Sequence, residues 1–341
     1  MSQIIPKKRL TVETYWQKEL TTSFSDPESL LKYLELPAED YAEDIKARKL
    51  FPMRVPREFA ARMVKGDPKD PLFLQVFTQQ KEFYSVKGYS KDPLQEQDNQ
   101  QPGILHKYQN RLLLLVRGGC AVNCRYCFRR HFPYSDNHLN KQQWQTAINY
   151  IAENPQIDEV IYSGGDPLMA KDDFLAWLTA QIENIAHVKR LRIHTRLPVV
   201  IPARITDELM TWFSKSRLKP VMVLHINHAN EIDEKVASAV KKLKDAGVTM
   251  LNQAVLLKGI NDTAEQQITL NERLFEIGIM PYYLHVLDKV EGAEHFDVPE
   301  PQALDLMADL IKRQPGYLVP KLVREIGGQP GKTPLDLKLH P

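Results

Sequence analysis

The sequence predicts an α/β protein in which an incomplete (β/α)6 barrel follows a helical extension at the amino terminus. The first observation is a change of pattern near residue 106, after which short apolar segments alternate with amphipathic segments of helical period. Strands and helices that alternate in this way form a parallel sheet with right-handed crossovers. The second observation is that the alternation occurs six times rather than eight, which indicates a barrel that does not close.

The first 105 residues are polar and rich in proline. A helix is expected over residues 26–34, where Asp26 can cap the first turn and leucines recur at helical spacing. Four prolines between residues 52 and 71 interrupt the chain, and residues 91–104 have the composition of a loop or linker. Residues 1–105 show no chemical motif. We therefore expect a helical scaffold that packs on another element or exchanges arms with one. Arm exchange between two copies of the chain would form a homo-oligomer.

The barrel is expected over residues 106–315, and residues 316–341 form a separate C-terminal segment. The predicted strands are 111–117, 159–163, 190–195, 221–226, 250–256 and 280–286. The predicted helices are 141–153, 171–185, 206–215, 233–246, 264–277 and 301–312. Thr206 opens one helix with a capping pattern, and Gly247 stands where another should end. Functional residues of such a sheet gather at the carboxyl ends of its strands.

The charge balance excludes several classes of partner. The chain of 341 residues has 45 Lys and Arg against 43 Asp and Glu, a net charge of +2, which argues against nucleic acid and anionic membranes.

The amino terminus lacks the apolar core of a signal peptide, and the longest apolar run, residues 112–116, is far shorter than the ~20 residues that span a bilayer. The 3 cysteines are clustered, which indicates a reducing compartment rather than disulfides. We expect a soluble cytoplasmic protein.

All cysteines of the chain lie in one loop after the first predicted strand, at Cys120, Cys124 and Cys127. Four thiolates complete a [4Fe–4S] cluster, so three leave one iron open for chemistry. The C-x3-C-x2-C spacing, with Tyr126 before the last cysteine, resembles the signature of radical S-adenosylmethionine (SAM) enzymes, whose free iron is chelated by SAM. The alternative is a zinc knuckle in which His131 is the fourth ligand.

The second predicted strand runs directly into Ser163-Gly164-Gly165-Asp166. Two glycines let the backbone approach a ligand closely, although the same residues also suit an ordinary turn. In radical SAM enzymes a Gly-Gly-acid segment at this strand end meets the SAM amino group. We therefore predict that Gly164, Gly165 and Asp166 contribute to cofactor binding.

A glycine-rich turn near the C-terminus carries Lys332. It nearly matches a nucleotide P-loop, but residue 326 is Ile where the pattern requires Gly, and Pro334 prevents the helix that should follow. Lys332 is either a flexible surface lysine or an amine that forms a Schiff base with pyridoxal phosphate (PLP). The glycines would let the lysine swing aside when a substrate amine replaces it.

Several charged residues could complete a site for an amino acid. Asp288 follows the sixth strand and Glu325 precedes the glycine turn, so the two carboxylates could receive a substrate ammonium group. Arg129 could bind a carboxylate through two hydrogen bonds. Lys107 and Arg111 could hold a phosphate. Ordinary solvated charges remain the alternative for each.

Taken together, the motifs resemble the lysine 2,3-aminomutases, which are radical SAM enzymes that also carry PLP. The likeness spans roughly residues 100–335. It is carried by Cys120, Cys124, Cys127, Arg129, Arg130, residues 163–168, residues 225–228, residues 252–262, Tyr282, Tyr283, Asp288, residues 294–296 and Lys332. The resemblance implies an α/β radical SAM barrel, a [4Fe–4S] cluster, SAM and PLP, with lysine as substrate and an electron donor as partner.

The resemblance also assigns residues to these ligands. Lys332 corresponds to the lysine that binds PLP covalently, and Arg111, Tyr108 and Lys107 correspond to the segment that holds its phosphate. Gln253 stands at a position facing the cofactors. For the substrate, the corresponding residues are Arg129 at the α-carboxylate and Asp288 and Glu325 at the ε-ammonium.

The chain departs from the family pattern in three respects. Glu325 stands where the family has aspartate, and Lys107 where arginine is usual. Cysteine is absent after Cys127, so we expect no structural zinc of the kind found in longer members. The short form resembles bacterial enzymes that make (R)-β-lysine, which a separate ligase attaches to elongation factor P. A mutase for another amino acid such as glutamate is the alternative, and Asp288 would repel an acidic side chain.

Overall fold

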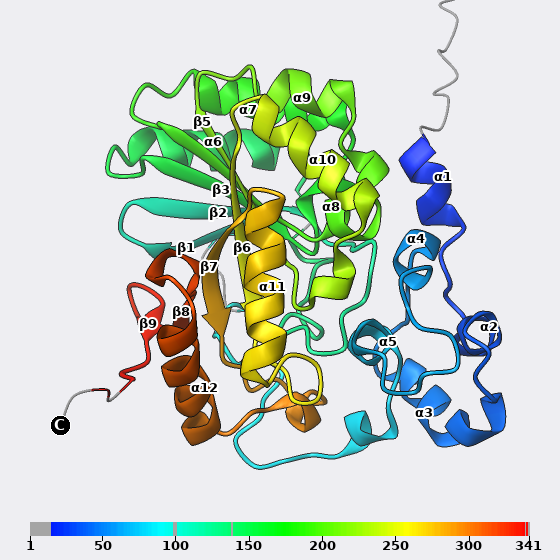
Figure 1. Cartoon of the computed structure of the whole chain (residues 1–341). Helices are drawn as coiled ribbons and strands as arrows, with labels where there is room; N and C mark the ends of the chain where they lie inside the picture. Colours follow the sequence, from blue (N-terminus) through cyan, green and yellow to red (C-terminus); the bar gives the residue numbers. More distant parts are fainter. Residues whose placement is uncertain (1–14, 98–100, 138, 338, 340–341) are drawn as a thin grey trace, which may run out of the picture.

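The computed structural model describes residues 15–97, 101–137, 139–337 and 339, and within them nine strands form a single sheet in the order of the chain (Figure 1). Strands β2 to β8 are parallel, whereas β1 and β9 pair antiparallel at the two edges. The strands are β1 Ile104–Tyr108, β2 Arg111–Arg117, β3 Glu159–Gly164, β4 Arg190–Thr195, β5 Lys219–Leu224, β6 Thr249–Val255, β7 Met280–His285, β8 Lys321–Arg324 and β9 Thr333–Pro334. The sheet is an open, incomplete barrel, as predicted.

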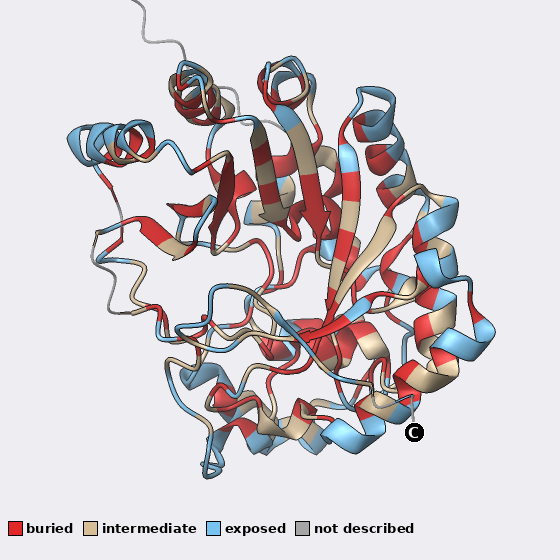
Figure 2. Cartoon of the chain, turned by 90° about the vertical axis from the view of Figure 1, so that its left-hand side faces the viewer, coloured by how far each residue is buried: buried red, intermediate tan, exposed pale blue. Residues whose placement is uncertain are grey.

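Six helices follow the strands and cover the outer side of the sheet (Figure 1). They are α6 Lys141–Glu153, α7 Asp172–Glu183, α9 Asp207–Phe213, α10 Glu234–Asp245, α11 Ala264–Glu276 and α12 Glu300–Arg313, with the short α8, Leu197–Val200, after β4. Their outward turns are exposed, while the strands beneath are mostly buried (Figure 2). The six predicted strands and six predicted helices are all present, each end within two residues of the expected one.

Three strands were not predicted from the sequence. β1 begins within the segment expected to be a loop, β8 adds a seventh parallel strand, and β9 pairs with β8. Each is two to five residues long, which is too short to show a period. The strands matter for the site because β1 carries Lys107 and Tyr108, β8 ends one residue before Glu325, and β9 begins one residue after Lys332.

Local sequence explains where the helices begin and end. The Asn140 side chain accepts a hydrogen bond from the Gln143 amide at the start of α6, and Thr206 caps α9 through the Leu209 amide. Gly247 follows α10 with φ of +81°, the left-handed conformation that glycine allows at a helix end. These signals are local, which is why they could be read from the sequence.

The amino-terminal region is a set of short helices beside the barrel, on the right of Figure 1. They are α1 Tyr15–Thr21, α2 Pro27–Tyr33, α3 Ala42–Lys46, α4 Arg57–Ala60 and α5 Pro71–Val76. Asp26 caps α2 as expected, and the apolar residues of α5 are buried in the main core. The Arg62 guanidinium donates to the Val199 carbonyl at 2.6 Å, which ties this region to the loop after β4.

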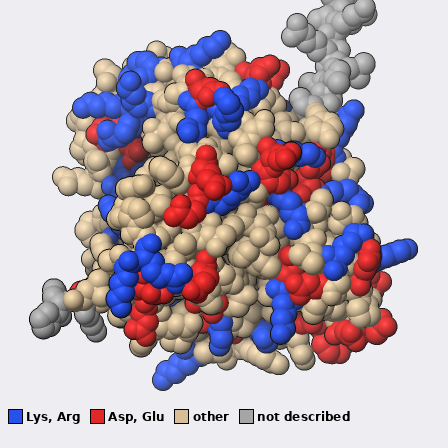
Figure 3. Space-filling view, in the orientation of Figure 1, with Lys and Arg blue, Asp and Glu red and all other residues tan. Residues whose placement is uncertain are grey.

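Acidic and basic side chains are interspersed over the face seen in Figure 3. None of the helices in the described part of the chain is long and apolar enough to cross a bilayer.

Candidate active site

A cavity of about 600 Å3 lies inside the barrel and extends from the cysteine loop, at the carboxyl ends of the parallel strands, to Arg111, Glu159 and Thr249 at their amino ends. Every residue that the resemblance assigned to the cluster, SAM, PLP or lysine lines this one cavity. Parallel strands place their carboxyl ends at one edge of the sheet, so side chains far apart in sequence converge there. The cysteine loop, the Gly-Gly segment and the turn bearing Lys332 therefore face a common space.

The cysteine loop follows β2 and is fastened to the amino-terminal region by its backbone. The Asn123 amide donates to the Arg54 carbonyl at 3.0 Å, and the Arg125 amide donates to the Gln75 carbonyl at 2.9 Å. The Arg54 side chain returns a hydrogen bond to the Cys120 carbonyl at 3.0 Å. The amino-terminal region therefore contacts the cysteine loop directly, through these three hydrogen bonds.

The three thiols are suited to an iron–sulfur cluster. Burial, followed by the neighbouring thiols, raises the pKa of Cys120 well above its usual value and the pKa of Cys127 to about 11. Thiols in such a place stay neutral until a metal deprotonates them. In the described residues no three His, Cys, Asp or Glu side chains are placed to hold a single metal ion. The zinc alternative also required His131, whose Nε2 lies 3.1 Å from the Glu291 carbonyl oxygen and outside the cavity lining.

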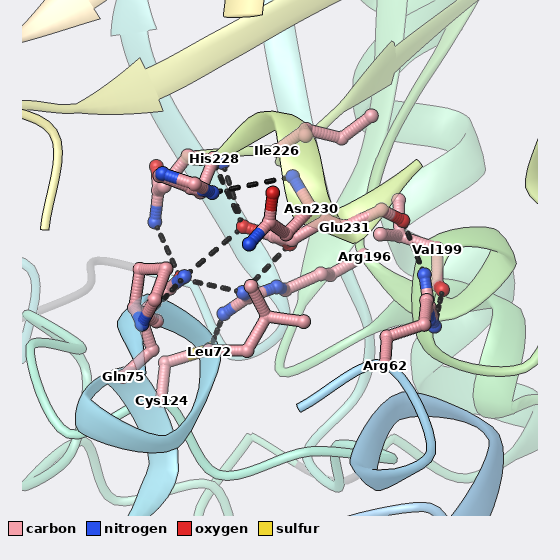
Figure 4. A network of polar contacts seen from close by, with 12 residues as sticks. Arg62, Leu72, Gln75, Cys124, Arg196, Val199, Ile226, His228, Asn230 and Glu231 are labelled. Carbon is pink, nitrogen blue, oxygen red and sulfur yellow. Dashed lines mark hydrogen bonds and ion pairs between the residues drawn. The ribbon is translucent and has the colours of Figure 1, made fainter. Parts of the chain in front are cut away.

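A buried polar network supports the cysteine loop from the side of β4 (Figure 4). Arg196 directs Nη1 to Cys124 Sγ at 2.7 Å and to the Tyr126 hydroxyl at 2.6 Å. Its Nη2 donates to Gln75 Oε1 at 2.7 Å and to Glu231 Oε2 at 2.9 Å. A cation fixed beside a thiol stabilises the thiolate, so the network fits a cluster ligand. The sequence analysis did not identify Arg196; its place directly after a strand was the available signal.

The Gly-Gly segment packs against the backbone that leads into the cysteine loop. Gly164 has φ of +127°, and a side chain there would collide with the Arg117 carbonyl. A Cβ on Gly165 would lie 2.6 Å from the Gly118 carbonyl oxygen. No other residue type fits these two contacts, so the strand end and the cluster loop share one wall of the cavity.

Asp166 closes this wall by binding the loop after β4. Its carboxylate accepts the amides of Leu168 at 3.0 Å, Arg196 at 2.8 Å and Leu197 at 2.9 Å, together with the Thr195 hydroxyl. Its side chain therefore holds the cavity wall in shape.

At the opposite end, Lys332 Nζ lies 2.6 Å from Glu325 Oε2. Glu325 Oε1 accepts from Lys107 Nζ at 3.2 Å and from the Tyr108 hydroxyl at 3.2 Å. Burial opposes ionisation of Glu325, but the two lysines outweigh it and hold its pKa well below the usual range. Burial and the nearby Glu325 charge raise the pKa of Asp288 to about 7. The two predicted acids therefore differ. Glu325 is ionised and paired with lysines, whereas the pKa of Asp288 lies near neutral pH.

Arg129 projects from the cysteine loop toward the same space. Its Nε and Nη2 donate to Glu96 at 2.7 and 3.1 Å, and its Nη1 donates to Ser163 Oγ and the Gly164 carbonyl, each at 3.1 Å. Burial alone would lower the pKa of Arg129, but Glu96 raises it instead. Glu96 comes from residues 91–104, the segment expected to be a loop or linker, and its buried side chain lines the cavity.

The remaining predicted residues also have defined places. The Arg111 guanidinium lies 3.9 Å from the centroid of the Tyr108 ring. Gln253 Nε2 lies 2.8 Å from His225 Nε2. The Nε2 atoms of His194 and His285 are buried without a partner in the described structure, and burial lowers the pKa of both rings. These cavity-lining groups are available to hydrogen-bond a ligand.

Comparisons with known proteins agree with this geometry. A family model described as the radical SAM superfamily matches residues 114–268. The chain is 57% identical over 326 residues to an L-lysine 2,3-aminomutase of Escherichia coli (strain K12), a match that covers 95% of each protein. It is 56% identical over 333 residues to one of Haemophilus influenzae, covering 97% of this chain and 98% of that protein. The chain belongs to the L-lysine 2,3-aminomutase family.

Membership confirms the resemblance that the motifs indicated. The radical SAM match contains the cysteine loop and the Gly-Gly segment, whereas Glu325 and Lys332 lie beyond it. A longer member, from Clostridium subterminale, is 35% identical over 323 residues, which cover 94% of this chain and 77% of that protein. In length the chain thus corresponds to the Escherichia and Haemophilus members rather than to the longer one.

Proposed function

We propose that this protein is a radical SAM aminomutase that converts L-α-lysine to β-lysine with the help of PLP. The reaction exchanges two groups between neighbouring carbons: the amino group moves from Cα to Cβ, and a hydrogen moves from Cβ to Cα. The observation that carries the proposal is that a three-thiol loop and a lysine held by a carboxylate face one cavity. Family membership supplies the reaction class.

Each group of residues has a proposed task. Cys120, Cys124 and Cys127 would hold three irons of a [4Fe–4S] cluster and leave the fourth for SAM, which the Gly164–Gly165 backbone would meet. Lys332 would carry PLP, with Lys107, Tyr108 and Arg111 at its phosphate and Gln253 facing the cofactors. When bound, SAM and a cluster reduced by an external electron donor supply the radical, and PLP carries the migrating nitrogen and delocalises the unpaired electron.

The polar groups of the cavity favour lysine as the substrate. Arg129 offers a guanidinium to the α-carboxylate, and Asp288 and Glu325 offer carboxylates to the ε-ammonium. Asp288 gains most from a cation, because burial and the Glu325 charge raise its pKa to about 7 and a nearby cation would stabilise its ionised form. A glutamate substrate would place a third carboxylate beside these two, which costs binding energy, so the glutamate mutase is disfavoured.

The test is an anaerobic assay of protein reconstituted with iron, sulfide, PLP and SAM, together with a reductant. We expect β-lysine from lysine and no β-glutamate from glutamate. Lys332→Ala should abolish turnover and the visible absorbance of covalently bound PLP, while its iron content stays at the wild-type level. Formation of β-glutamate alone, or PLP bound covalently to the Lys332→Ala variant, would reject the proposal.

We also propose that the product is the (R) enantiomer and that a ligase attaches it to elongation factor P. The support is the correspondence in length to the shorter members of the family. Chiral chromatography of the product tests the first part. Incubation of that product with the purified ligase and elongation factor P tests the second, because the mass of elongation factor P must rise by one lysyl residue. An (S) product would contradict both parts.

A further inference from the structure

We propose that Glu96 is a positioning residue that aligns Arg129 and Lys107, the two cations assigned to the anionic groups of lysine and of PLP. The inference rests on the proposed function and adds a residue to it. Glu96 is 3% exposed and lies between the two cations inside the cavity. Its Oε1 is 2.6 Å from Lys107 Nζ, and both of its oxygens accept from Arg129.

The backbone of Glu96 is itself held in place. The Asp92 carboxylate accepts the amides of Glu96 and Gln97, at 2.9 and 3.0 Å, and so closes a tight turn. The turn presents the Glu96 side chain to the cavity from a segment outside the barrel. Asp92 therefore offers a second way to disturb the position of Glu96 without removing a charge from the cavity.

The hydrogen bonds of Arg129 divide into two groups of different strength. Glu96 takes the Nε–Nη2 edge through two charge-assisted bonds, whereas Nη1 contacts the neutral acceptors Ser163 Oγ and the Gly164 carbonyl. Charge-assisted hydrogen bonds are about twice as strong as neutral ones. A substrate carboxylate will accordingly displace the neutral partners and leave Glu96 bound. Glu96 then fixes the plane of the guanidinium, while Nη1 of Arg129 binds the substrate carboxylate.

Lys107 extends the same alignment toward PLP. Its ammonium lies between Glu96 Oε1 at 2.6 Å and Glu325 Oε1 at 3.2 Å. Glu325 in turn holds Lys332. Alternating charges thus run from Arg129 through Glu96, Lys107 and Glu325 to Lys332, and Glu96 is the shared counter-ion of both anion-binding cations.

Positioning and simple electrostatics predict opposite results for Glu96→Gln. The Glu96 charge by itself repels a carboxylate or a phosphate, so its removal would tighten the binding of both. If Glu96 instead acts by holding the cations in place, removal loosens them and weakens binding. Hydrogen bonds to charged groups are strong enough that losing their alignment should raise dissociation constants about tenfold. The sign of the change therefore decides between the two effects.

The experiment measures binding by calorimetry to PLP-loaded protein, with lysine and with lysinamide, which lacks the carboxylate. We expect Glu96→Gln to raise the Kd of lysine about tenfold and that of lysinamide less than threefold. The Kd of PLP, titrated by absorbance, should rise in the same variant. Glu96→Asp should recover part of each loss, and Asp92→Asn should reproduce a smaller loss. Glu300→Gln, an exposed glutamate paired with Arg324, is the matched control and should change nothing.

Tighter or unchanged binding of lysine by Glu96→Gln would overturn the proposal. Equal weakening of lysine and lysinamide would also overturn it, because a general structural defect does not distinguish the two ligands. Turnover of lysine by the wild-type protein is measured in parallel. Its absence rejects the proposed function, whereas wild-type turnover with an unaltered Glu96→Gln variant rejects only the role of Glu96.

Discussion

Lysine binding should depend on pH through Asp288. Its pKa of about 7 makes it neutral in acid, and only the ionised form attracts the ε-ammonium of lysine. About half of Asp288 is ionised at pH 7 and about one-tenth at pH 6, so the apparent Kd of lysine should rise about fivefold between pH 7 and 6, approach tenfold per pH unit below 6 and level off above 8. Glu325 stays ionised over this range, and His285 stays neutral because burial lowers its pKa.

The assay compares lysine with norleucine, which has the same chain length but no ε-ammonium. Titrating both ligands into PLP-loaded protein between pH 5.5 and 8.5 cancels the pH dependence of PLP itself. We expect the ratio of the two dissociation constants to change about tenfold between pH 6 and 8. Asp288→Asn should make the ratio independent of pH, and Glu325 should then be the remaining carboxylate that favours lysine over norleucine.

Two results would refute this reasoning. A lysine-to-norleucine ratio that stays constant from pH 5.5 to 8.5 in the wild-type protein would show that Asp288 does not titrate against the ammonium. A ratio that still changes in Asp288→Asn would assign the titration to another group.

Three further predictions concern the cysteine loop. Glu82→Gln leaves two buried arginines without their shared carboxylate and should lower the free energy of unfolding in urea by about 3–5 kcal/mol; an unchanged midpoint would contradict this. Gly165→Ala places a Cβ 2.6 Å from the Gly118 carbonyl oxygen, so iron bound after reconstitution should fall below half, whereas full iron loading would show that the loop yields freely. Arg196→Gln removes a cation from Cys124 and should lower the midpoint potential of the cluster by tens of millivolts, since about 59 mV corresponds to a tenfold change in a one-electron equilibrium. In an EPR-monitored titration, the midpoint potential of Arg196→Lys should lie between those of the wild-type protein and Arg196→Gln. Equal potentials in all three proteins would refute the role of Arg196.

The sequence by itself determined those features that depend on neighbours along the chain. The alternation of apolar and amphipathic segments predicted six βα units, and caps such as Thr206 marked where helices begin. The spacing of three cysteines and the glycines around Lys332 indicated two cofactors before any fold was known. Such patterns are local, because helical and strand periods repeat within one element and the ligands of one loop lie within a few residues.

Only the tertiary structure decided which charges meet. Glu96 stood in a polar segment that looked like a linker, and its pairing with Arg129 and Lys107 joins the extension to two elements of the barrel. The contact of Arg196 with Cys124 spans 72 positions of the chain. Single charged residues carry no period and no spacing that marks them, and their partners are chosen by how the strands converge at the barrel mouth. The physical reason is that burial of an ionised group requires a counter-charge, and only the folded chain brings one within reach.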